Sequence, residues 1–253
     1  EPRKGNPPPR IAETPAGILN SVGLQNPGVQ AFIEKEIPFL RGFDTAIIAN
    51  ASGNTIEDYE YMVETLSDAD IDGIELNLSC PNVKEGCMSF GSTANGVFEV
   101  VSRVKKKAVK PLIVKLTPNV TDITEIARAA EAAGADAVSL INTLLGMAID
   151  AKTRRPILGN VTGGLSGPAV KPVALRMVWQ VSKAVNIPII GMGGISNGTD
   201  AVEFLLAGAS AVMMGTAGFV NPMAWVETIE GLENYMAENK VKSVTELIGG
   251  LIV

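Results

Sequence analysis

The sequence predicts an α/β fold, a (β/α)8 barrel of the TIM type, in which parallel strands alternate with helices. Six strand-like segments are each followed by a helix-like segment along the 253 residues, and this alternation is typical of a parallel sheet. A faint repeat, Ala133–Val138 and Ala207–Val212, places a glycine where a helix ends and a strand begins. A doubly wound sheet is the competing architecture, but the sequence lacks its G-x-G-x-x-G turn after the first strand.

The alternation begins near residue 45, where apolar runs with a period of two mark the strands. Capping residues mark two helix starts, Thr55 with Asp58 and Asp122 with Glu125. The expected strands are Thr45–Asn50, Ile74–Ser79, Pro111–Leu116, Ala137–Asn142, Pro188–Gly191 and Ala211–Met214. The expected helices begin at Thr55 and Asp122 or lie near 94–107, 170–185, 198–207, 221–238 and 243–249.

Residues 1–44 are rich in proline and glycine, and we expect them to be irregular, with Leu19–Gly28 as a structured loop. A long glycine-rich loop is expected after Asn142. Eight strands close a barrel of this type, whereas the pattern provides six, and the chain begins without methionine. We therefore expect residues 1–253 to be a single barrel domain from which about two N-terminal βα units are missing.

Composition excludes several classes of function. The net charge is −6 and no basic stripe occurs, so nucleic acid is not an expected partner. No apolar run is long enough to cross a membrane. The two cysteines have neither a metal-binding nor a disulfide spacing, which favours a reducing cytoplasm. Because histidine is absent, a base acting near neutral pH must be a cysteine, a lysine or a carboxylate of raised pKa.

Polar side chains stand at the carboxyl ends of four consecutive expected strands, where barrels of this type place their functional groups. They are Asn50, Asn77, Lys115 and Asn142, and the period of two places Asn142 on the face of Leu140. Asparagine is common where strands become loops, and a lysine can reach water along its own stem. Four such residues in succession indicate a ligand site. Lys115 supports this interpretation, because an ammonium in an apolar strand needs an anionic partner.

The last two strands end in glycine instead, within Ile190–Ile195 and Met213–Thr216. In such barrels, backbone N–H groups in the loops after strands seven and eight bind phosphate. Gly163–Gly167 adds a third glycine-rich segment, expected to be flexible and near the same rim. The residues alone therefore predict a barrel that binds a phosphate-bearing ligand recognised by amides.

The stretch Asn77–Asn82 places Cys80 at a strand exit, immediately before a proline that ends the strand. A thiol in this position can act as an acid, a base or a nucleophile, and Cys80 is our candidate acid or base. Free cysteine is also among the most buried residue types, so a role in packing alone is the alternative.

These segments closely resemble class 1 dihydroorotate dehydrogenase, an FMN enzyme of pyrimidine synthesis, and the resemblance extends over essentially the whole chain. Its most specific pieces are Asn20–Leu24, Asn77–Asn82, Ile141–Thr143, Gly193–Gly194 and Gly215–Thr216. Leu144–Met147 and Gly163–Pro168 look more like the NAD-linked 1B branch than the fumarate-using 1A branch. Cys87 departs from the family pattern, which tends to have glycine in that position.

The resemblance implies that Cys80 removes a proton from carbon five of dihydroorotate while a hydride leaves the neighbouring carbon for FMN. It implies binding of dihydroorotate and orotate by Asn20, Ser21, Val22, Gly23, Leu24, Asn77, Asn142 and Thr143. It implies binding of FMN by Asn50, Asn77, Lys115, Ile141, Gly167, Gly193, Gly194, Gly215 and Thr216. No metal site is expected.

In the 1B branch the flavin is reoxidised through a second subunit that carries FAD and a 2Fe–2S cluster, and two cysteines are too few for a cluster on this chain. The resemblance therefore implies a homodimer of catalytic subunits joined to that partner. The alternatives in the same fold are another FMN enzyme, similar to dihydropyrimidine dehydrogenase, a flavin-free phosphosugar isomerase or lyase, and a catalytically silent scaffold.

Overall fold

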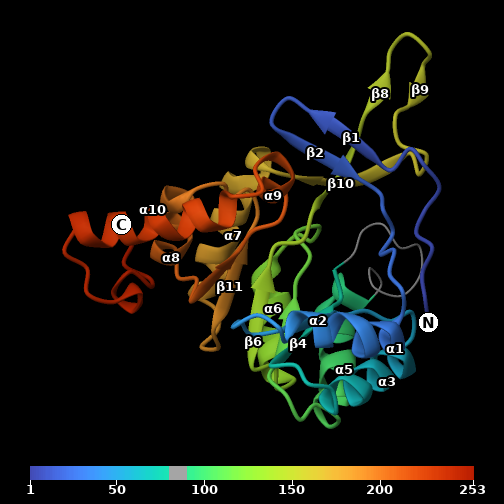
Figure 1. Ribbon diagram of the computed structural model, residues 1–253, viewed down its shortest axis with the longest axis horizontal. Coiled ribbons are helices and arrows are strands. Elements are labelled where there is room, and N and C mark those ends of the chain that lie inside the picture. The colour runs from blue at the N-terminus through green and yellow to red at the C-terminus, as the bar shows by residue number, and fades with distance from the viewer. Residues whose placement is uncertain (80–89) are drawn as a thin grey trace.

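The computed structural model describes residues 1–79 and 90–253. Within them, six parallel strands form one curled sheet in the order β12-β11-β6-β5-β4-β3 (Figure 1). The six expected strands are confirmed, and closure by eight strands stays a prediction. The strands are β3 (Ile48–Ala51), β4 (Gly73–Asn77), β5 (Leu112–Lys115), β6 (Ala137–Leu140), β11 (Ile189–Met192) and β12 (Ala211–Met213).

Helices connect these strands and pack on the outer face of the sheet. The predicted start at Thr55 is confirmed, because its side chain accepts a hydrogen bond from the N–H of Asp58 and its own N–H donates to the Asp58 carboxylate. Asp122 likewise caps its helix by accepting from the N–H of Thr124. The main helices are α3 (Ile56–Ser67), α5 (Ala94–Lys105), α6 (Ile123–Ala132), α7 (Lys171–Ser182), α8 (Gly198–Leu206) and α10 (Ala224–Glu238).

Alternation along the strands separates an apolar outer face from a polar inner face. On β4, Ile74 and Leu76 are fully buried in the main hydrophobic core, which they share with residues of the surrounding helices. The residues between and after them, Glu75 and Asn77, point to the inner face. Because the register pairs Asn77 with Lys115 of β5, the polar ends of neighbouring strands converge at one rim.

The N-terminal segment is more regular than expected. Two strands within residues 1–44 form an antiparallel hairpin, which continues into a sheet with two strands from the glycine-rich segment after Asn142. The prediction of irregular structure was wrong for the two strands within 11–20 and for those after Asn142, because such short, turn-rich strands carry little alternation and their pairing partners are remote in sequence. The loop predicted at Leu19–Gly28 is confirmed for residues 21–28, which lie between β2 and α1. The sheet comprises β1 (Ile11–Thr14), β2 (Gly17–Asn20), β10 (Thr162–Ser166) and β7 (Leu144–Met147). Helical turns α1 (Val29–Ala31), η1 (Phe32–Glu36) and α2 (Ile37–Leu40) follow the hairpin.

The glycines of β10 permit close packing and do not mark a flexible loop. A Cβ on Gly163 would lie 2.6 Å from the carbonyl oxygen of Asn20, and a Cβ on Gly164 would lie 2.6 Å from Cβ of Thr143. The expectation of a flexible segment was therefore wrong for these two residues, which are glycine because neighbouring chains approach them so closely.

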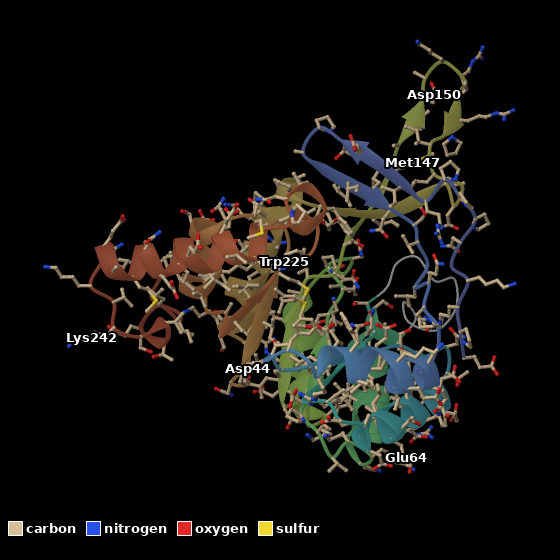
Figure 2. The ribbon with its side chains drawn as sticks, in the orientation of Figure 1. Asp44, Glu64, Met147, Asp150, Trp225 and Lys242 are labelled. Atoms are coloured by element: carbon tan, nitrogen blue, oxygen red, sulfur yellow. The ribbon has the colours of Figure 1, made fainter. Side chains whose placement is uncertain are left out.

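A small hairpin of β8 (Ile149–Asp150) and β9 (Arg155–Pro156) projects from this second sheet (Figure 1). Figure 2 shows Met147 and Asp150 toward this projection, with Asp44 and Glu64 in the opposite part of the molecule. The projection therefore lies apart from the helices that pack on the parallel sheet.

The C-terminal helices are shorter than expected. The helix predicted over 221–238 is α10, which begins only at Ala224 because Asn221 adopts the extended conformation that a following proline favours; a separate turn, α9 (Ala217–Val220), precedes it. The helix predicted near 243–249 is a single turn, η3 (Val244–Glu246), followed by a glycine pair that does not support a helix. A further single turn, η2 (Pro168–Val170), precedes α7.

Candidate active site

The inner face of the parallel sheet carries a network centred on Glu75, which is 3% exposed. Asn50 donates to Oε2 of Glu75 at 2.5 Å, and Ser139 donates to Oε1 at 2.6 Å. The ammonium of Lys115 lies 3.5 Å from Oε2. Lys115 therefore has the anionic partner that its place in an apolar strand demands. Sequence reasoning did not assign Glu75 to the site, although the need of Lys115 for an anionic partner indicated a carboxylate nearby.

A second series of hydrogen bonds connects the predicted asparagines. Asn77 donates to Oδ1 of Asn50 at 3.2 Å, and its own Oδ1 accepts from the Ser79 hydroxyl at 2.9 Å. Asn142 donates to the same hydroxyl at 2.7 Å. The structure thus brings Asn50, Asn77 and Asn142 together through Ser79, which sequence reasoning missed. The signal for Ser79 was its position two residues after Asn77, on the same face of the strand.

Asn142 reaches this network from beyond the end of its strand. β6 ends at Leu140, whose side chain is fully buried in the helix-side core, whereas Ser139 faces Glu75. The expectation that Asn142 shares the face of Leu140 does not hold, because the alternation of faces stops where the strand ends.

The exits of β11 and β12 present backbone in place of side chains. Gly193 and Gly194 have φ values of 128° and 78°, in a region that other residues rarely adopt. A Cβ on Gly215 would meet no heavy atom within 4 Å, so this residue borders open space. Thr216 donates to the hydroxyl of Ser166 at 2.8 Å and ties the exit of β12 to β10. Bare backbone beside open space favours an oxyanion such as phosphate.

These two kinds of strand end border one cavity of about 670 Å³. This volume suits a small-molecule ligand, and Met192, Met213 and Met214 provide part of an apolar wall. The predicted site residues that line this cavity are Asn20, Val22, Lys115, Ile141, Asn142, Thr143, Gly167, Gly193, Gly194, Gly215 and Thr216.

The other predicted residues lie outside the wall of this cavity. Asn50 and Leu24 border a second cavity of about 440 Å³. Asn77, Ser21 and Gly23 line neither of these two cavities, although Asn77 remains bonded to Asn50.

Cys80 and Cys87 lie outside the described residues. The assignment of Cys80 as the base therefore stays a prediction.

Two of the predicted substrate residues carry buried hydroxyls that have no hydrogen-bond partner within the described chain. They are Ser21 and Thr143. A buried polar group left unpaired costs about 1–3 kcal/mol. Because Thr143 also lines the cavity, a polar group of a ligand placed there would remove that cost.

A charged cluster anchors the segment that follows the glycine exit of β11. Lys171 donates to Asp200 at 2.5 Å, and Asp200 accepts from the N–H and the hydroxyl of Ser196. Burial alone would raise the pKa of Asp200, but the hydrogen bonds from Lys171 and Ser196 outweigh it and hold this pKa below its usual value. The hydrogen bonds to Asp200 and Glu203 raise the pKa of Lys171. Both partners are therefore charged at neutral pH, and the segment is fastened to α7 and α8.

Metal sites and membrane spans are both absent from the part of the chain that the structure describes. Within 1–79 and 90–253, the structure has no group of three or more cysteine, aspartate or glutamate side chains that could hold a metal ion. None of the helices in the same ranges has the length and apolar character needed to span a membrane.

A curled parallel β/α sheet whose strand ends gather polar side chains and bare glycines around one cavity defines an α/β protein with a candidate ligand site at its strand ends. Comparison with known families identifies it further. The model of the family described as dihydroorotate dehydrogenase matches residues 1–236. The chain belongs to the dihydroorotate dehydrogenase family, and the resemblance seen in the sequence is confirmed.

Three curated relatives, each named dihydroorotate dehydrogenase B (NAD(+)), catalytic subunit, are similar along nearly the whole chain. The relative from Alkaliphilus metalliredigens is 64% identical over 251 residues, which cover 99% of this chain and 83% of the relative. The relative from Bacteroides thetaiotaomicron is 61% identical over 252 residues, with 99% and 83% covered. That from Thermoanaerobacter pseudethanolicus is 58% identical over 252 residues, with 100% and 83% covered.

Proposed function

We propose that this chain is the catalytic subunit of an NAD-linked dihydroorotate dehydrogenase, which oxidises dihydroorotate to orotate in pyrimidine biosynthesis. The observation that carries the proposal is the cavity with Lys115 and asparagines on one side and bare glycines on the other. Membership of the dihydroorotate dehydrogenase family supports the assigned reaction, and the names of the relatives support the assignment to the NAD-linked branch.

The residues around the cavity fit FMN. The backbone at Gly193, Gly194 and Gly215 suits its phosphate, and open space adjoins Gly215. The ammonium of Lys115 suits the negative charge that a flavin ring acquires on reduction. Bound FMN supplies the hydride acceptor for the oxidation. The remaining residues that we assign to it are Asn50, Asn77, Ile141, Gly167 and Thr216.

The substrate lies, in this proposal, where amide side chains and the unpaired hydroxyl of Thr143 meet the cavity. Asn142 and the buried hydroxyl of Thr143 provide donors and acceptors for the ring amides and the carboxylate of dihydroorotate. The other residues that we assign to the substrate are Asn20, Ser21, Val22, Gly23, Leu24 and Asn77.

Cys80 acts as the base, and its thiolate takes the proton from carbon five. The double bond of orotate forms as a hydride leaves carbon six, so the substrate loses one proton and one hydride. Because a free thiol has a pKa of about 8.5, only its ionised fraction can act and the rate should rise with pH.

Anaerobic mixing with substrate tests the proposed function. The FMN-loaded protein is mixed with dihydroorotate, and bleaching of the visible flavin band is followed together with orotate formation. We expect rapid bleaching with dihydroorotate and little with dihydrouracil, which lacks the carboxylate. Preference for dihydrouracil would favour a dihydropyrimidine dehydrogenase-like enzyme, and a folded protein that cannot be loaded with FMN would contradict the flavin assignment.

The electron acceptor is reached through a second subunit. We propose that two copies of this chain act in the cytoplasm with a partner that carries FAD and a 2Fe–2S cluster, and the term catalytic subunit in the names of the relatives supports this division. The chain alone should reduce its FMN with dihydroorotate but pass electrons slowly to NAD, and adding the partner should restore NAD reduction. Fast NAD reduction by this chain alone would contradict the division, and preference for fumarate would indicate the 1A branch.

A further inference from the structure

Glu75 is a buried carboxylate that takes no part in the proton and hydride transfers of the proposed reaction. It lies in the middle of β4, with 4% of its side chain exposed. A carboxylate in such a place is costly unless partners satisfy it, and removing those partners leaves a buried charge uncompensated. Its presence on the inner face, in contact with a residue of the cavity wall, therefore calls for an explanation.

The partners of Glu75 come from three other strands. Asn50 of β3 and Lys115 of β5 both contact Oε2, at 2.5 and 3.5 Å, and Ser139 of β6 donates to Oε1 at 2.6 Å. The register places Asn50 beside Glu75 and Lys115 beside Ser139, so one carboxylate joins four adjacent strands. Two of these partners, Asn50 and Lys115, are residues that we assign to FMN.

Glu75 contacts these residues without reaching the cavity itself. Lys115 lines the cavity and Glu75 does not. Within the described residues, Lys115 forms its ion pair with Glu75 alone. The contact is long and involves one oxygen, and an ammonium has three donors, so donors of Lys115 remain for a ligand.

We propose that Glu75 is a positioning residue that fixes the Lys115 ammonium and the Asn50 amide for bound FMN and moderates the positive charge that the flavin meets. This inference rests on the proposed function, because it assumes that FMN occupies the cavity. An unmoderated ammonium stabilises the negative charge of a reduced flavin more strongly. Glu75 therefore holds the potential of the bound flavin below the value that Lys115 alone would set.

The test is Glu75→Gln, which keeps the shape and leaves an oxygen to accept from Asn50 and Lys115 while it removes the charge. We expect FMN to bind and its midpoint potential to rise by about 30 mV or more, which is a tenfold change for a two-electron couple. The potential is measured by anaerobic dye-equilibrated titration of the loaded protein. Lys115→Met should shift the potential in the opposite direction.

Glu60→Gln is the matched control, because Glu60 forms an ion pair with Arg103 at 2.8 Å between α3 and α5, away from the rim. It should lower stability and leave the potential unchanged. A potential that Glu75→Gln does not move, together with a lowered melting temperature, would mean that Glu75 is only structural and would overturn the inference.

A second variant keeps the inference testable where Glu75→Gln does not fold. Glu75→Asp retains the charge and withdraws the carboxylate from Asn50 and Lys115. We expect a smaller positive shift and FMN binding weakened by more than about threefold, since the contacts that hold Asn50 and Lys115 in place are stretched. Wild-type values for both quantities would overturn the inference. Failure of wild-type protein to bind FMN would instead refute the proposed function.

Discussion

The two sides of the cavity offer a ligand different chemistry. On the side of β3–β6, side chains such as Lys115 and Asn142 are held in a hydrogen-bonded network. On the side of β11 and β12, Gly193, Gly194 and Gly215 expose backbone. A side-chain contact can be removed by substitution, whereas a backbone contact can only be displaced. Substitutions on the first side should therefore change the chemistry, and those on the second should change cofactor affinity.

Cys80→Ala should give the largest effect, because Cys80 is the proposed base. We expect flavin reduction by dihydroorotate to slow by roughly two to four orders of magnitude, the range for loss of a general base, with FMN affinity unchanged. Cys80→Ser should retain some rate, more at high pH. Stopped-flow absorbance of the loaded variants provides the measurement.

Cys87→Gly is the control for the loss of a thiol and should have little effect. If Cys80→Ala reduces its flavin at the normal rate, Cys80 has a packing role and the chemistry does not depend on the side-chain side in the way we propose.

Gly194→Ala should affect the backbone side. A Cβ there would lie 2.8 Å from the carbonyl oxygen of Gly167 and 2.9 Å from the N–H nitrogen of Lys171, at a φ of 78°. Relieving these clashes displaces the backbone N–H groups that we assign to the phosphate. Loss of one hydrogen bond to a charged group costs about 1.5–3 kcal/mol, so FMN should bind roughly ten- to a hundredfold more weakly. Fluorescence titration of the apoprotein measures the affinity, and saturation with FMN should restore most of the reduction rate.

Gly134→Ala is the matched control, since Gly134 has a φ of 96° after α6, where a Cβ would meet only the flexible Lys105 side chain at 3.3 Å. It should lower stability and leave FMN affinity unchanged. Equal losses of FMN affinity in the two variants would show that the effect at Gly194 is general backbone strain.

Asp200→Asn should have the smallest effect on the flavin. The depressed pKa of Asp200 in the folded chain contributes stability that is present above the unfolded value of about 3.9 and is lost as pH falls through the folded pKa. The variant should lose about 1–3 kcal/mol at neutral pH, because Lys171 loses one of its two charged partners and keeps only Glu203. Its stability should then fall less steeply in acid.

Urea unfolding between neutral pH and the acid range measures both effects, with the exposed Asp44 replaced by asparagine as the control. The raised pKa of Lys171 gives the opposite dependence, since its contribution is lost as pH rises through the folded value. Parallel acid profiles of wild type and Asp200→Asn would contradict the assignment of this pair as an anchor.

The sequence was sufficient for the parallel strands but not for the second sheet. β4 alternates, β5 is a short apolar run, and both lie in the core, so their patterns are determined by burial. β2 and β10 pair across a long sequence separation, and their glycines reflect close approach of backbones, which no local pattern shows. Local patterns therefore indicated loops for both strands.

Site residues could be predicted from the sequence where they follow the two-residue alternation of side chains along a strand. Asn77 and Lys115 were found in this way, and the place of Lys115 in an apolar strand indicated an anion without identifying Glu75. Ser139 was missed because a serine in a strand has no signature until its neighbours on other strands are known, whereas Ser79 was missed although it shares the face of Asn77. Asn142 was found, but its face was not, since it lies past the end of β6.

A crystal structure of the FMN-loaded protein with orotate tests the division between the two sides most directly. We expect the phosphate within hydrogen-bond distance of backbone N–H groups at Gly193–Gly194 and Gly215–Thr216. We also expect the flavin ring beside Lys115, with orotate against Asn142 and Thr143. A phosphate held by side chains of the β3–β6 side, or a flavin bound wholly within the second cavity, would contradict the division.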